Sequence, residues 1–110
     1  MVQQISEIKN TVVELASNLI NRIDSICGCT DERSKYARIV DFMDDLMALS
    51  EGVNAIKDYY KDIDLAELLE KLDMLKKAME ESDSFLVDDL MKFELKDLLI
   101  YWKEILMDKQ

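Results

Sequence analysis

Residues 3–26 of the chain read QQISEIKNTVVELASNLINRIDSI, and aliphatic side chains recur in this run every three or four residues. They are Ile5, Ile8, Val12, Leu15, Leu19, Ile23 and Ile26. This spacing places them on one side of an α-helix, in the manner of a heptad seam. We therefore predict an amphipathic helix over residues 3–26, about 36 Å long at 1.5 Å per residue.

A second amphipathic helix is predicted over residues 31–61. Gly28 provides the stop before it, because glycine accepts the left-handed conformation that ends many helices, and Thr30 offers an N-cap. The apolar face consists of Tyr36, Ile39, Met43, Leu46, Val53, Ile56 and Tyr60. Ser50 to Gly52 interrupt this face, and glycine weakens a helix. Two predictions stay open here: the helix is kinked near Gly52, or it is broken there.

Two further helices follow along the chain. Asp64 and Glu67 resemble a capping box that opens the third helix, and Ser82 or Asp83 can cap the fourth. The third helix is expected to bury Leu65, Leu68, Leu69, Leu72, Leu75 and Met79. The fourth, over residues 85–107, is expected to bury Val87, Leu90, Met91, Leu98, Tyr101 and Ile105. Additional apolar residues surround the fourth helix, which is typical of a central helix or of one that contacts a partner.

The connections between these four helices are short, and no linker or internal repeat separates them. Short connections make consecutive helices antiparallel neighbours. The chain has 110 residues, a length that suits one domain. We predict an all-α fold: a single domain over residues 1–110 that forms an antiparallel up-down-up-down four-helix bundle.

The charge of the chain limits its partners. It carries 14 basic and 24 acidic residues, a net charge of −10 that would repel nucleic acid and anionic membranes and attract a basic protein. Acidity that only keeps the protein soluble is the simpler interpretation. We see no signal peptide and no run of about 20 apolar residues, so we expect a cytoplasmic protein with no membrane segment.

Candidate chemistry is sparse. The absence of histidine removes the commonest general base and zinc ligand, and no phosphate-binding loop is found, so we expect neither an enzyme nor a cofactor. Cys27 and Cys29 flank a single residue and are expected to be free thiols, with a redox or intermolecular metal role as the alternative. Acidic pairs and triplets could hold a hard cation, although such runs more often form a solvated helix face. They are Asp41, Asp44 and Asp45, and Asp88 with Asp89.

Four residues of the fourth helix are the predicted partner-binding site: Phe93, Glu94, Tyr101 and Trp102. Glu94 falls on the apparent core stripe, where a buried carboxylate needs hydrogen-bond donors; it would fix helix register or contact a partner. Consecutive helical residues diverge by about 100°, so either Tyr101 or Trp102 is expected to be partly exposed. Exposed aromatic side chains are typical interface anchors.

The same helix carries a pattern of Asp-Leu-Leu, aromatic-Glu-Leu, Leu-Leu and Trp over residues 88–102. This run resembles small bacterial all-helical proteins of unknown function. Met91 and Ile100 depart from the strictest form of the pattern. The resemblance covers about fifteen residues and implies a helix and a bacterial origin, but no activity.

The leading functional prediction is a chaperone-like or adaptor-like binding or assembly module. It would present an apolar helix face, rimmed by acid, to a basic or amphipathic partner helix, with Glu94 as a buried anchor. The alternative is a homodimer or larger structural bundle, in which the first helix and the fourth complete a core between chains. A carboxylate metal-binding protein comes third.

Overall fold

The computed structural model describes residues 2–108, and its helices account for all regular structure in that range. The first three helices are α1 (Val2–Cys27), α2 (Glu32–Ile56) and α3 (Leu65–Glu80), with a short 3-10 turn, η1 (Lys57–Tyr59), after α2. The fourth is continuous and comprises α4 (Ser84–Asp89), the π-helical segment η2 (Leu90–Leu95) and α5 (Lys96–Asp108). The predicted all-α class is confirmed, while residues 1 and 109–110 of the predicted domain lie outside the described part.

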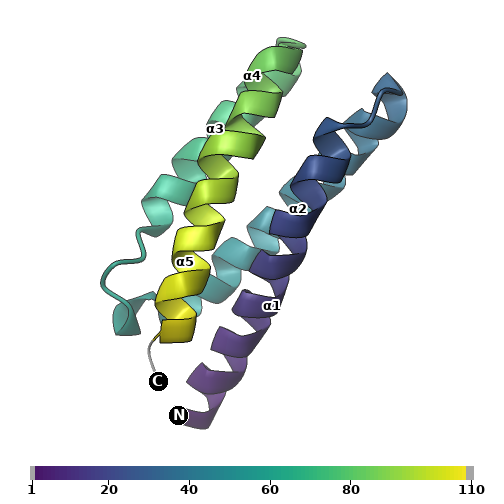
Figure 1. Cartoon of the computed structure of the whole chain (residues 1–110). Helices are drawn as coiled ribbons and strands as arrows, with labels where there is room; N and C mark the ends of the chain where they lie inside the picture. Colours follow the sequence, from purple (N-terminus) through teal and green to yellow (C-terminus); the bar gives the residue numbers. More distant parts are fainter. Residues whose placement is uncertain (1, 109–110) are drawn as a thin grey trace.

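The helices form an elongated bundle of 44 × 21 × 19 Å. In Figure 1 each helix runs back along its predecessor, and the start of α1 and the end of α5 lie at the same end of the molecule. α1 packs against α2 and α5, while α3 packs against α2, α4 and η2. None of the described helices is both long and apolar enough to cross a membrane.

The core draws on every long helix. Val12, Leu19, Ile23 and Ile26 of the predicted α1 seam are buried in it, and the other seam residues, Ile5, Ile8 and Leu15, pack partly buried against it. The largest fully buried side chains are Phe42 and Trp102. The α1 seam thus faces the chain's own core. The remaining core side chains are Ala16, Ile39, Leu46, Leu49, Val53, Ile56, Tyr60, Ile63, Leu68, Leu72, Leu75, Ala78, Val87, Leu90, Met91, Leu95, Leu98, Leu99 and Leu106.

The second helix passes through Gly52 without interruption, so the prediction of a break there is wrong. A Cβ atom at this position would lie 2.8 Å from Cγ2 of Val12, closer than real contacts allow. Glycine is therefore needed for the close approach of α1 and α2, and it does not end the helix. The buried Ser50 is also compatible with the helix, because its hydroxyl donates to the Met47 carbonyl at 2.6 Å. α2 ends at Ile56, five residues before the predicted end.

Aspartates cap the three helices that follow a connection. The carboxylate of Asp31 accepts a hydrogen bond from the Ser34 N–H, so the α2 cap lies one residue after the predicted Thr30. Asp64 accepts from the Ala66 N–H at α3, as the capping pattern predicted. Asp83, one of the two candidates for the fourth helix, accepts from the Leu86 N–H. These bonds satisfy backbone donors that have no partner inside the helix.

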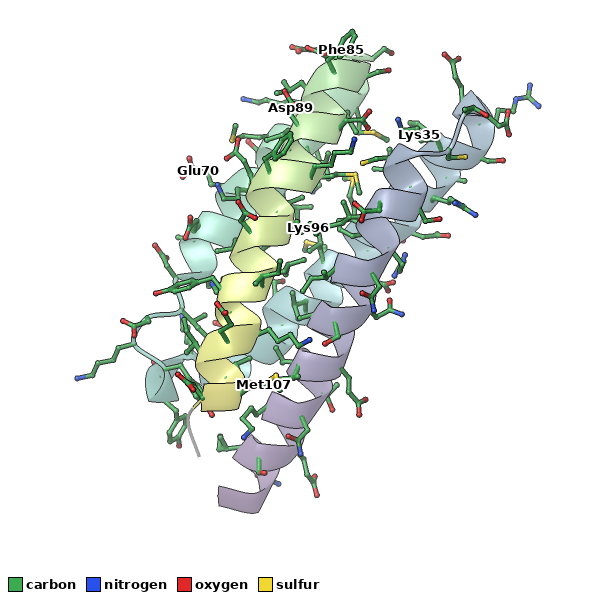
Figure 2. The ribbon with its side chains drawn as sticks, viewed as in Figure 1. Lys35, Glu70, Phe85, Asp89, Lys96 and Met107 are labelled. Atoms are coloured by element: carbon green, nitrogen blue, oxygen red, sulfur yellow. The ribbon has the colours of Figure 1, made fainter. Side chains whose placement is uncertain are left out.

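Within residues 2–108, four ion pairs connect different helices. Lys96 extends from α5 toward α1 in Figure 2, where it meets Asp24. Partly exposed pairs of this kind each contribute about 0–1 kcal/mol, so apolar burial dominates stability. The pairs are Arg22–Asp45 at 2.6 Å, Lys35–Asp88 at 3.0 Å, Lys71–Glu94 at 2.8 Å and Lys96–Asp24 at 3.5 Å.

The turn between α3 and α4 contains a residue in the left-handed conformation. Ser82 has a φ of 55°, and its N–H donates to the Met79 carbonyl while the Asp83 N–H donates to the Ala78 carbonyl. This pair of bonds is the Schellman arrangement, in which glycine usually occupies the left-handed position. A residue with a Cβ pays about 1–2 kcal/mol to adopt that conformation.

We therefore expect Ser82→Gly to raise the free energy of unfolding by about 0.5–1 kcal/mol, because relief of strain exceeds the added freedom of the unfolded chain. Urea denaturation with an unchanged m-value would measure it. The matched control is Ser84→Gly, two residues later at the first position of α4, which should lower stability. Equal effects of the two substitutions would contradict the assignment.

Candidate partner-binding surface

The π-helical segment η2 decides which side chains of the last helix face outward. Its hydrogen bond runs from the Lys96 N–H to the Met91 carbonyl, five residues back instead of four. One additional residue is thereby accommodated in the turn, as in other π-bulges. The core stripe consequently continues from Leu90 and Met91 to Leu95, and then to Leu98 and Leu99.

Glu94 is the residue most affected by this shift. Uninterrupted α-helical spacing would place it on the core stripe, but Leu95 occupies that position instead. The Glu94 side chain is 44% exposed, and its Oε1 accepts a hydrogen bond from Nζ of Lys71 at 2.8 Å. The prediction of a buried anchor is therefore wrong, and Glu94 lies at the surface between η2 and α3.

The three predicted aromatic residues separate into exposed and buried ones. Phe93 is 63% exposed and Tyr101 is 49% exposed, whereas Trp102 is only 1% exposed. The expectation that one of the two neighbours Tyr101 and Trp102 is exposed is confirmed. Trp102 belongs to the core, and its indole N–H has no hydrogen-bond partner among the described residues. A partner could reach it only if the bundle opened.

Three of the four predicted residues line one hollow. Phe93, Glu94 and Tyr101 surround a space of about 420 Å³ between α3 and the last helix. Sequence reasoning did not place α3 at this site, because contacts between helices cannot be read from the spacing within one of them. The remaining lining residues are Glu67, Lys71, Asp97 and Leu98.

The hollow has an acidic rim. Three carboxylates, from Glu67, Glu94 and Asp97, face a single ammonium group, that of Lys71. The hydrogen bond to Glu94 raises the pKa of Lys71, so this lysine stays charged and committed to Glu94. Glu67 and Asp97 form no ion pair within the described residues. Their charges remain available to a cationic side chain from outside.

The carboxylate runs considered for a cation do not form a site. Among the described residues, no three or more histidine, cysteine, aspartate or glutamate side chains are grouped to hold a metal ion. Two of the candidate aspartates take part in ion pairs instead, Asp45 with Arg22 and Asp88 with Lys35.

Cys27 is the last residue of α1, at the opposite end of the bundle from the start of that helix (Figure 1). Both cysteines are free and partly buried. Burial raises the pKa of Cys27 to about 11, and the negative charge of the neighbouring Asp88 acts in the same direction. Only the thiolate is a nucleophile, so Cys27 is almost entirely in its unreactive form at neutral pH.

Trp102→Ala should lower the free energy of unfolding by about 3–5 kcal/mol, because it leaves a large cavity in the core. Tyr101→Ala, at the adjacent exposed position, should cost less than about 1 kcal/mol. Urea denaturation followed by circular dichroism compares the two. If Trp102→Ala proves too unstable to fold, Trp102→Phe keeps much of the volume and should show an intermediate loss. Similar losses at positions 101 and 102 would contradict the burial of Trp102.

The raised pKa of Cys27 predicts slow alkylation. In a Cys29→Ser variant at pH 8, iodoacetamide should modify Cys27 roughly 10–100 times more slowly in the folded protein than in urea, because the thiolate is scarcer. Asp88→Asn in the same background should speed the reaction by removing a nearby negative charge. Mass spectrometry gives the rates. Equal rates for folded and unfolded chains would show that the pKa is not raised.

Comparisons with known proteins leave the site without a precedent. No family model, curated protein or solved structure matches the chain. The resemblance of residues 88–102 to small bacterial helical proteins therefore stays a prediction.

Proposed function

We propose that this protein is a binding module that holds a basic segment of a partner protein in the hollow between α3 and the last helix. The observation that carries the proposal is the exposure of Phe93 and Tyr101 on the rim of one acidic hollow. Aromatic side chains provide large contact area for little conformational entropy, and they recur at the energetic centres of interfaces. Two of them beside a concave surface provide suitable anchors for a partner.

The charge of the hollow selects the kind of partner. Because Lys71 is paired with Glu94, the net field at the rim comes from Glu67 and Asp97. A segment with lysine or arginine next to apolar residues would satisfy both the carboxylates and the aromatic rings. An amphipathic helix fits this description, since α3 and α5 would flank it as a groove. The net charge of −10 would further accelerate its association.

The proposal concerns binding, because the exposed rings of Phe93 and Tyr101 border the hollow and offer contact area to a partner. A chaperone-like or adaptor-like role is the form of binding we infer. We place it in the cytoplasm, because two unpaired cysteines persist as thiols in a reducing compartment.

The test uses a designed amphipathic peptide with leucine on one face and lysine on the other. We expect it to bind and to shift the amide NMR signals of Lys71, Phe93, Glu94 and Tyr101 more than those of other residues. Phe93→Ser and Tyr101→Ser should each weaken binding about 5- to 30-fold, in line with the loss of an aromatic anchor.

Two controls make the result specific. A peptide with glutamate in place of lysine should not bind, because the acidic rim repels it. Phe85→Ser removes another aromatic ring, which is 88% exposed and does not line the hollow, and should leave affinity unchanged. Binding that ignores Phe93 and Tyr101, or that favours the acidic peptide, would refute the proposal.

A further inference from the structure

A second group of apolar side chains lies outside the core on α2. Tyr36, Val40, Met43 and Met47 follow one another at steps of four, three and four residues, the spacing of a coiled-coil seam. Sequence analysis placed Tyr36 and Met43 in the core, but Tyr36 is 60% exposed and Met43 is only partly buried. Val40 and Met47 are exposed as well. We refer to these four residues as the α2 stripe.

The α2 stripe lies on the α3 side of the helix, away from the hollow. Tyr36 borders a small space with Met79 of α3, whereas Asp45 and Gly52 face α1 from the other side of α2. The stripe extends over twelve residues, roughly 16 Å along the helix.

Two unpaired charges stand beyond the ends of the α2 stripe. Arg33 and Glu51 are eighteen residues apart, which is five full helical turns, so they lie on the same edge of α2. Both are exposed, and neither forms an ion pair within the part of the chain described by the structure. This edge of α2 therefore has a charge polarity along its length, with a basic group near the N-terminal end and an acidic group near the C-terminal end.

That polarity selects an antiparallel copy of the same helix. When two α2 helices align with Val40 facing the partner's Met43, Tyr36 faces the partner's Met47. Arg33 then lies level with the partner's Ser50, one residue from Glu51 on the same edge, and the same pairing with Glu51 recurs at the other end. In a parallel alignment Arg33 and the partner's Glu51 would lie at opposite ends of the contact, and equivalent residues would lie on opposite edges, so this pair could not form.

We propose that a second copy of the chain covers the α2 stripe, with the two α2 helices antiparallel. The contact is short and the two chains carry like net charges, so we expect a weak dimer with a Kd on the order of 10–100 µM at about 0.15 M salt. This contact uses none of the hollow residues, and it stands or falls independently of the proposed function.

Sedimentation equilibrium from about 10 µM to about 1 mM tests the proposal across the expected Kd. The mass should rise from 12.8 kDa toward twice that value. Val40→Glu should keep the protein monomeric, because it places a charge in the middle of the stripe. Phe85→Glu is the matched control: Phe85 is an exposed ring at the tip of α4 in Figure 2, and the dimer should persist. Circular dichroism verifies that both variants fold.

Charge reversal tests the orientation. Arg33→Glu and Glu51→Arg should each weaken the dimer about 5-fold or more, since each opposes like charges at both ends. The combined variant restores opposite charges and should return the Kd to within about 2-fold of the original. A protein that stays monomeric up to about 1 mM, a dimer that survives Val40→Glu, or a combined variant that fails to recover would each overturn the proposal.

Discussion

The last helix has to bury apolar side chains on both sides of its π-helical segment, and the rest of the molecule depends on how it does so. Val87, Leu90 and Met91 enter the core before the extra residue of η2, and Leu95 and the residues beyond it enter after it. The same shift turns Glu94 outward to Lys71 and leaves Phe93 and Tyr101 on the rim of the hollow. On the last helix, a single change of helical register thus decides which side chains are buried and which are exposed.

Spacing alone predicted the helices, the α1 core residues and the cap at Asp64, because these depend on neighbours within a few residues. It failed at Glu94, since the prediction assumed a constant helical period. The signal was nevertheless present: the apolar pairs Leu90–Met91 and Leu98–Leu99 are eight residues apart, one more than two α-helical turns require.

Exposure was harder to predict than helix position. α2 has more apolar residues than its core face can hold, and the sequence does not show which flank remains uncovered. Contacts with α1 and α3 settle this question, and they depend on the close approach at Gly52 and on the buried anchors Tyr60 and Ile63. The hollow was unpredictable for the same reason, because Glu67 and Lys71 join it from a separate helix.

The ion pairs have a consequence for the handedness of the bundle. Four helices with the same core faces can be arranged in two senses of rotation, and apolar burial discriminates poorly between them. In the observed sense, Arg22 of α1 meets Asp45 of α2, while Asp24, on the other flank of α1, meets Lys96 of α5. The opposite sense would exchange the flanks of every helix, so Arg22 would no longer face Asp45, Asp24 would no longer face Lys96, and both ion pairs would be lost. Weak surface charges can therefore select the topology of a fold that they hardly stabilise.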